Sequence, residues 1–224
     1  MRIFISRYLK PDSPFFKRLL VHQYQIISES LIQFSEVNID RIPTSDMLFF
    51  YSKNAVRYAI KNARLRTIMQ QRQLATMGRG TAKVLAEFGF EADFIGSGIP
   101  AEIALRLESY AANQSILFLR ANNSRQSIQL HLPSHIHAQD MVVYNNNPKT
   151  DFNIPEVDLL VFTSPINAQA YFGKYSFMMD QQVLAIGHTT ARALSDLGIP
   201  DVLIADEASE ESLVDKILEV SLKN

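Results

Sequence analysis

The stretch "TMGRGTAKVLAEFG" (Thr76–Gly89) returns later in the chain as "AIGHTTARALSDLG" (Ala185–Gly198). The two stretches align on Gly78 and Gly187. They also share Thr81/Thr190, Ala82/Ala191, Leu85/Leu194 and Gly89/Gly198. Such self-similarity at a fixed spacing indicates that the chain contains two copies of one structural unit.

The repeat extends beyond this pair. "IPTSDMLFFYS" (Ile42–Ser52) matches "IPEVDLLVFTS" (Ile154–Ser164), and "IFISR" (Ile3–Arg7) resembles "ILFLR" (Ile116–Arg120), all at nearly the same spacing. A chain of 224 residues has room for two domains of about 100 residues each. We therefore predict an internal duplication with one copy in each of two domains.

Each copy alternates two kinds of segment. Short apolar runs such as "MLFFY" (47–51) and "SILFL" (115–119) are typical of buried parallel strands. Helical patterns lie between them, and Gly89 and Gly198 stand where left-handed helix ends are expected. The sequence predicts an α/β fold with two doubly wound, flavodoxin-like domains built on parallel sheets.

Two segments break the alternation. "ESLIQFSEV" (Glu29–Val37) and "DMVVYNNN" (Asp140–Asn147) look extended, and neither leads promptly into a helix. We expect two linker strands here, residues 30–37 and 139–147. One domain then comprises residues 1–29 plus 148–224, and the other residues 38–138.

Composition narrows the functional classes. The net charge of −1 argues against non-specific nucleic-acid binding, and the lack of cysteine rules out disulfides and thiolate metal sites. Arg2, Arg7 and Lys10 interrupt the apolar N-terminal stretch, so it does not resemble a secretion signal. No apolar run reaches the 18 or more residues of a membrane span. We expect a soluble cytoplasmic protein with no nucleic-acid or membrane partner.

Candidate binding residues follow the predicted strands, where open α/β sheets collect their ligands. Small or hydroxyl-bearing residues stand there just before helices, and backbone N–H groups at such helix starts bind anions. The alternative interpretation is that Thr81, Ser164 and Thr189 only cap their helices. The sequence contains no phosphate-loop, dinucleotide-binding or nucleophile-elbow motif. The triplet His131, His135 and His137 has no nearby Glu, and we do not expect a metal site there.

At this point the motifs resemble a known family. "VFTSPINA" (Val161–Ala168), "AIGHTTARALSDLGI" (Ala185–Ile199) and "MVVY" (Met141–Tyr144) are similar to the patterns of uroporphyrinogen-III synthases, in the same order along the chain. The resemblance implies a lyase of tetrapyrrole (haem-type) biosynthesis that cyclises hydroxymethylbilane, with inversion of ring D and loss of water. It implies no cofactor and no metal. We expect a monomer acting on this small molecule, with at most a transient contact with the preceding pathway enzyme.

The resemblance also assigns roles to residues. Tyr144 matches a family tyrosine thought to help the substrate hydroxyl leave, although an aromatic residue packing between domains is the alternative. Thr190 matches a family threonine whose hydroxyl or amide meets a substrate carboxylate, and Thr81 is its copy. Ser52 and Ser164 match the family serines that follow the second strand of each repeat. The full predicted substrate-binding set is Arg7, Ser52, Lys53, Asn54, Arg79, Gly80, Thr81, Arg120, Ser164, Pro165, His188, Thr189 and Thr190.

The chain departs from the family pattern in places. Tyr51 replaces a threonine before Ser52, Lys53 stands where the second copy has Pro165, and "LPSHIHAQD" (Leu132–Asp140) occupies a region usually containing glycine. These differences affect the contacts expected in the domain of residues 38–138.

Two other functions are compatible with the residues alone. One is a non-catalytic, two-domain intracellular protein that binds a small polyanion. The other is a flavodoxin-like cofactor carrier, in which Tyr51 and Tyr8 would stack on a flavin.

Overall fold

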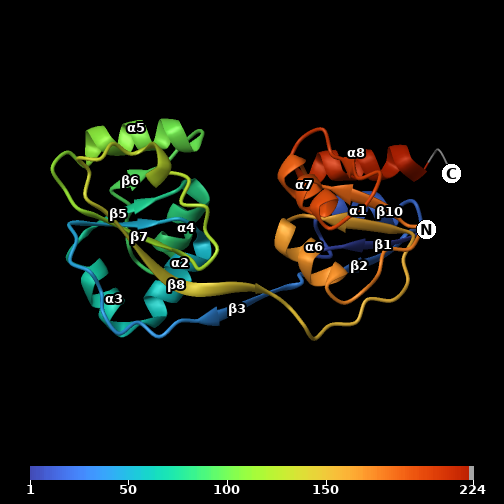
Figure 1. The fold of residues 1–224 in the computed structure, drawn as a ribbon, viewed down its shortest axis with the longest axis horizontal. Coiled ribbons are helices and arrows are strands. Elements are labelled where there is room, and N and C mark those ends of the chain that lie inside the picture. Colours follow the sequence, from blue (N-terminus) through green and yellow to red (C-terminus); the bar gives the residue numbers. More distant parts are fainter. Residues whose placement is uncertain (222–224) are drawn as a thin grey trace. The chain divides into compact units, whose positions relative to one another are not determined.

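The computed structural model describes residues 1–221, which form two compact units. Unit 1 combines residues Met1–Gln33 with the chain from Asn147 onward, and unit 2 comprises Phe34–Asn146. The chain therefore leaves unit 1, builds all of unit 2, and returns to complete unit 1 (Figure 1).

Unit 1 contains a sheet of five parallel strands in the order β11-β10-β9-β1-β2. Its strands are β1 (Arg2–Ile5), β2 (Gln25–Ser28), β9 (Leu159–Phe162), β10 (Gln182–Ala185) and β11 (Leu203–Ile204). Its helices are α1 (Pro14–Leu20), α6 (Pro165–Phe172), α7 (His188–Asp196) and α8 (Glu210–Ser221).

Unit 2 contains a six-stranded sheet in the order β3-β8-β7-β4-β5-β6. Its strands are β3 (Ile32–Glu36), β4 (Met47–Phe50), β5 (Gln73–Thr76), β6 (Phe94–Ile95), β7 (Ile116–Ala121) and β8 (Ala138–Pro148). Its helices are α2 (Lys53–Lys61), α3 (Ala63–Met69), α4 (Arg79–Glu87), α5 (Pro100–Tyr110) and the 3-10 helix η1 (Gln129–His131).

Each sheet buries both of its faces, which explains why its strands are continuously apolar. In β4, Leu48 and Phe50 pack under α2, α3 and α4, while Met47 and Phe49 pack under α5 on the opposite face. Unit 1 is built in the same way, with α6 and α7 on one face and α1 and α8 on the other (Figure 1). The predicted doubly wound α/β fold is confirmed.

The repeated sequence segments occupy equivalent strands of the two sheets. β4, β5 and β6 hold the positions in unit 2 that β9, β10 and β11 hold in unit 1, and β7 and β8 correspond to β1 and β2. In chain order, unit 1 has the flavodoxin-like arrangement 2-1-3-4-5. Unit 2 has the same spatial order with its first two strands moved to the end of the chain. The two copies are thus circular permutations of one another.

The segments expected as linker strands are β3 and β8. β8 pairs in parallel with β7 from Ala138 to Tyr144, and β3 lies next to β8 at the margin of the same sheet. Most of both segments therefore belongs to the sheet of unit 2.

The helix ends follow the sequence signals. Gly89 and Gly198, just after α4 and α7, have φ angles of +81° and +80°, the left-handed conformation that glycine adopts without steric cost. Among residues 1–221, no helix is both long and apolar enough to cross a bilayer.

Gly96 marks a close approach of two loops at the end of unit 2's sheet. A Cβ atom there would lie 2.4 Å from the carbonyl oxygen of Met77, whereas a Cβ at Gly78 would meet only ordinary contacts. We predict that Gly96→Ala lowers the free energy of unfolding by about 1–3 kcal/mol, since backbone atoms must move. Urea denaturation checks this, with Gly78→Ala as the matched control. Equal stability of the two variants would contradict the prediction.

Candidate active site

Parallel strands end at a common edge of each sheet, here called the carboxyl edge, and the predicted site residues lie there. At this edge β4 leads into α2 and β9 leads into α6. Ser52 Oγ accepts the N–H of Ala55 at 3.1 Å, and Ser164 Oγ accepts the N–H of Asn167 at 3.4 Å. Both serines therefore cap their helices, as the capping interpretation held for Ser164.

The second helix in each unit begins differently. Gly78 precedes α4 and Gly187 precedes α7, and neither makes a side-chain cap. Thr81 and Thr190 are buried, and their N–H groups donate to the carbonyls of Gly78 and Gly187, respectively, at 3.0 Å. The alternative interpretation, that Thr81 or Thr189 caps its helix, was wrong, because a glycine occupies the cap position in both cases.

The helices α4 in unit 2 and α7 in unit 1 thus begin at equivalent positions without a side-chain acceptor; α5 in unit 2 also lacks one, and it begins with Pro100. In α4 the N–H groups of Arg79 and Gly80, and in α7 those of His188 and Thr189, have no acceptor within the helix. The positive end of the helix dipole adds to their attraction for anions. The starts of α4 and α7 are therefore equivalent points, one in each unit, that are suited to a carboxylate.

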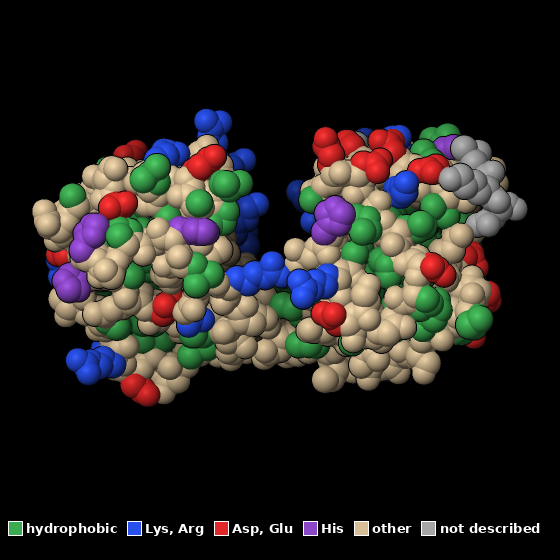
Figure 2. Space-filling view, turned by 45° about the horizontal axis from the view of Figure 1, so that its top comes forward, with side chains coloured by type: hydrophobic (Ala, Val, Ile, Leu, Met, Phe, Trp, Pro, Cys, Tyr) green, Lys and Arg blue, Asp and Glu red, His purple; other side chains and the backbone are tan. Residues whose placement is uncertain are grey.

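In unit 2, basic side chains lie near the start of α4. A Cβ at Gly80 would lie 3.1 Å from Cε and 3.7 Å from Nζ of Lys53, so the lysine side chain extends from α2 across the start of α4. Figure 2 shows basic side chains gathered on unit 2; the exposed cations on α2 and α4 are Lys53, Arg57, Lys61, Arg79 and Lys83. In unit 1 the positions of Lys53 and Arg79 are held by Pro165 and His188. The carboxylate point of unit 2 is therefore the more positively charged.

Other predicted binding residues have partners inside the protein. Arg7 forms an ion pair with Glu210 at 2.8 Å, and Asn54 accepts a hydrogen bond from Arg57. Arg120 pairs with Asp140 at 2.7 Å and also donates to the carbonyl of Ala121 at 3.0 Å. The Arg120 side chain is only 15% exposed and lies beside the bulge between β7 and β8. Its guanidinium group is therefore bound by partners within the protein.

Tyr144 lies in β8 opposite Ala121, the last residue of β7, at the carboxyl edge of the sheet, and it is only 5% exposed. Its Oη lies 3.0 Å from Ser52 Oγ, and its ring stacks on Tyr58 with centroids 5.3 Å apart and planes within 9°. The ring centroid of Phe34 lies 5.9 Å from that of Tyr144. All three partners belong to unit 2, so the aromatic contacts are made within one unit. Burial raises the pKa of Tyr144, which keeps the hydroxyl protonated as a donor.

Sequence reasoning missed two features. Tyr58 could have been suspected, since it follows Ala55 at helical spacing on the buried face of α2. A network in which Tyr51 hydrogen-bonds Gln129, and Gln129 bonds Asp140, gave no sequence signal, because its members are far apart in the chain. This network holds the loop after β7 against the sheet.

The two tyrosines of the flavin alternative lie in different units. Tyr51 is half-buried against Phe49 and Phe118 in unit 2, and Tyr8 is 74% exposed in unit 1. In the described part of the chain, no group of His, Asp and Glu side chains could hold a metal ion.

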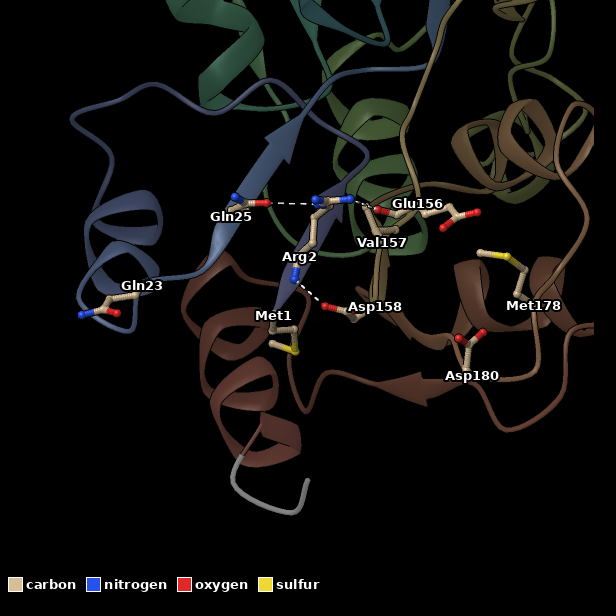
Figure 3. A pocket seen from close by; sticks show the side chains of 9 residues that line it. All are labelled: Met1, Arg2, Gln23, Gln25, Glu156, Val157, Asp158, Met178 and Asp180. Atoms are coloured by element: carbon tan, nitrogen blue, oxygen red, sulfur yellow. Dashed lines mark hydrogen bonds between the residues drawn. The ribbon is translucent and has the colours of Figure 1, made fainter.

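A cavity of about 530 Å³ lies elsewhere, at the amino ends of the strands of unit 1 (Figure 3). Its wall includes Arg2, whose side chain donates to Gln25 and to the carbonyl of Glu156, and whose backbone N–H donates to the Asp158 carboxylate. None of the predicted site residues is among the described residues that line it. Because ligands of open α/β sheets bind at the carboxyl edge, this cavity is not the candidate site.

The pH dependence of stability offers a test of the Tyr51 network. Burial raises the pKa of Tyr51 to about 12, whereas the unfolded chain has the ordinary value of about 10. The folded state holds this proton more tightly, so its contribution is complete below about pH 10 and is lost as the pH rises towards 12. We predict that Tyr51→Phe loses about 1 kcal/mol at neutral pH but declines less steeply above pH 10.

Urea denaturation at several pH values measures this slope. Part of the slope should remain in Tyr51→Phe, because burial also raises the pKa of Tyr144 and Tyr171. Tyr8→Phe removes an exposed hydroxyl and serves as the control. Identical slopes for the wild type and Tyr51→Phe would refute the assignment.

Comparison with known proteins agrees with this architecture. The family model described as HEM4, uroporphyrinogen-III synthase HemD, matches residues 16–215. The structure of uroporphyrinogen-III synthetase from Helicobacter pylori is similar over 98% of both chains, with 25% identity and a TM-score of 0.75. A mutant uroporphyrinogen III synthase from Thermus thermophilus shares the fold, with 13% identity and a TM-score of 0.55 over 100% of this chain and 99% of its own.

No curated protein sequence gives a significant match. The family match nevertheless spans most of the chain, and the two-unit fold is that of its structural relatives. The chain therefore belongs to the uroporphyrinogen-III synthase family of enzymes.

Proposed function

We propose that this enzyme converts hydroxymethylbilane to uroporphyrinogen III, closing the macrocycle with ring D inverted and water lost. This makes it a lyase of the hydro-lyase type. We further propose that it acts as a cytoplasmic monomer and contacts the enzyme that supplies the bilane only transiently. Family membership is the observation that carries the proposal, and the carboxyl-edge geometry supports it.

The substrate is a flexible chain of four pyrroles that carries eight carboxylates. A site for it needs many modest anion contacts instead of one strong ion pair. The uncapped starts of α4 and α7 supply backbone donors in each unit, and Lys53 and Arg79 add positive charge in unit 2. We assign carboxylate binding chiefly to these helix starts and Lys53. The buried Thr81 and Thr190 shape the first turns.

Tyr144 is the proposed donor to the departing hydroxyl. As the C–O bond of ring A breaks, the leaving oxygen takes up a proton and departs as water, and the remaining electron deficit is shared by the pyrrole nitrogen in an azafulvene. A neutral phenol can donate a hydrogen bond to this oxygen, and Tyr144 is neutral near pH 7 because burial places its pKa above the ordinary value of about 10. No metal or redox cofactor enters these steps.

The choice of product then depends on conformation. The substituted carbon of ring D must reach the azafulvene to form the spiro intermediate, which fragments and recloses with ring D inverted. Holding the carboxylates at fixed points shortens the search for that geometry, since positioning alone can lower a barrier by several kcal/mol. The free bilane instead closes through its unsubstituted end to isomer I.

Product analysis tests the proposal directly. Purified protein is supplied with hydroxymethylbilane, and the oxidised porphyrin isomers are separated by chromatography. We expect isomer III in catalytic excess over isomer I. Isomer I alone, formed at the uncatalysed rate in the presence of folded protein, would overturn the proposed function.

The uncapped helix starts give a second prediction. Gly187 has an extended backbone, and a Cβ there would approach Ala208 only to 3.9 Å, so Gly187→Ser fits without strain. Its hydroxyl would accept the N–H groups that we assign to a substrate carboxylate. We expect unchanged or slightly higher thermal stability and a KM raised about tenfold, the equivalent of one hydrogen bond to a charged group.

Steady-state kinetics and thermal denaturation measure these effects. Gly187→Ala adds the Cβ without the hydroxyl, and its KM should rise less. A KM in Gly187→Ser equal to that of the wild type would show that the start of α7 does not bind the substrate.

A further inference from the structure

The hydrogen bond between Ser52 and Tyr144 gives Ser52 a role different from the one its position predicts. Ser52 Oγ already accepts the Ala55 N–H at 3.1 Å and lies 3.0 Å from Tyr144 Oη. We propose that Ser52 and Tyr58 are positioning residues, which hold and polarise Tyr144 and do not bind the substrate themselves. This inference rests on the proposed function, in which Tyr144 is the donor to the leaving hydroxyl.

Proton counting gives the direction of the hydrogen bonds. A serine hydroxyl has one proton and two lone pairs, and one lone pair of Ser52 is used by the Ala55 N–H. If Ser52 donates its proton to Tyr144 Oη, the phenol proton is left to point at the substrate. The reverse direction would use the phenol proton within the protein. Catalysis by Tyr144 therefore requires Ser52 to be the donor.

The start of α2 favours this direction. Ser52 Oγ lies at the positive end of the helix dipole and receives a backbone N–H, and both effects make its own O–H a stronger donor. Hydrogen bonds in such a series polarise one another. The series runs from the Ala55 N–H through Ser52 to Tyr144, and its last O–H becomes the better proton donor.

Tyr58 fixes the ring that carries this hydroxyl. The ring of Tyr58 is nearly parallel to that of Tyr144, and Lys61 Nζ lies 4.9 Å from the centroid of the Tyr58 ring. Lys61 in turn pairs with Glu36 at 3.2 Å. The stacked ring of Tyr58 limits rotation of Tyr144 out of the plane that keeps Oη beside Ser52.

The second copy lacks this arrangement. Ser164 corresponds to Ser52 and caps α6 in the same way, but its Oγ accepts a further bond from the Asn167 side chain at 2.9 Å. Asn167 is 2% exposed and also accepts the Leu31 N–H at 2.8 Å. The two equivalent cap serines thus differ in their second contact: Ser164 binds the buried Asn167 in unit 1, and Ser52 binds Tyr144 in unit 2.

A double-mutant cycle tests the proposal through kcat and KM of the full-length enzyme for hydroxymethylbilane. We expect Tyr144→Phe to lower kcat about 100-fold, in the range of a lost proton donor. Ser52→Ala should lower kcat about tenfold and change KM less than about twofold. In the Tyr144→Phe background, Ser52→Ala should have almost no further effect on kcat, because it acts through the missing hydroxyl.

Further variants separate positioning from helix capping. Ser52→Thr keeps the hydroxyl and should restore most of the kcat. Ser52→Gly keeps an acceptable cap residue but removes the hydroxyl, so it should lose kcat as Ser52→Ala does while retaining more thermal stability. Asn62, whose side chain caps α3 in the same unit, gives the control for Ser52→Ala: Asn62→Ala should lower stability without lowering kcat. Tyr58→Leu should lower kcat only when Tyr144 is present.

Each alternative outcome overturns a different statement. Independent, multiplying losses in the double variant, or a raised KM with unchanged kcat in Ser52→Ala, would identify Ser52 as a direct substrate ligand. A wild-type kcat in Tyr144→Phe would leave nothing to position, yet isomer III formation would still uphold the proposed function. Absence of isomer III from the wild type would overturn the proposed function and this inference with it.

Discussion

The first N–H groups of a helix need acceptors, and this requirement organises the carboxyl edge of both sheets. At α2 and α6 a serine hydroxyl accepts one of these N–H groups. At α4 and α7 the cap residue is glycine, so no cap side chain accepts them. The distinction depends on a single residue at each strand–helix junction. It divides the helix starts into those that stabilise the fold and those that can attract an anionic ligand.

Duplication explains why this division occurs twice. Both sheets have the same strand order, and the serine and glycine junctions occupy the same places in each. The copies have nevertheless diverged around these shared points. Unit 2 acquired Lys53 beside Gly80 and Tyr144 beside Ser52, whereas unit 1 uses Pro165 and the buried Asn167 at the related positions. Related scaffolds thus present a charged, tyrosine-bearing edge in one unit and a more neutral edge in the other.

Much of the fold could be predicted from the sequence, because it depends on local patterns. Runs such as Met47–Phe50 are apolar at every position since both sheet faces are covered, and Gly89 and Gly198 end helices for a steric reason. The candidate site was less accessible to such reasoning. The pairing of Arg120 with Asp140 and the bond between Tyr144 and Ser52 join residues distant in the chain. Hydroxyl-bearing residues after a strand look alike in sequence. In the structure, however, Ser52 caps α2, whereas Thr81 is buried in the first turn of α4.

The division of unit 1 into two chain segments also has a consequence during synthesis. Its central pairing joins β1 to β9, and the bond from the Thr163 N–H to Ser6 closes a separation of 157 residues. At about 5–20 residues per second, a ribosome needs roughly 8–30 s to bring these partners together. Throughout that interval the apolar run Ile3–Ile5 can pair with β2 on one side but lacks β9 on the other, while the contiguous unit 2 can already fold. Unit 1 therefore completes its sheet only after unit 2 has been synthesised.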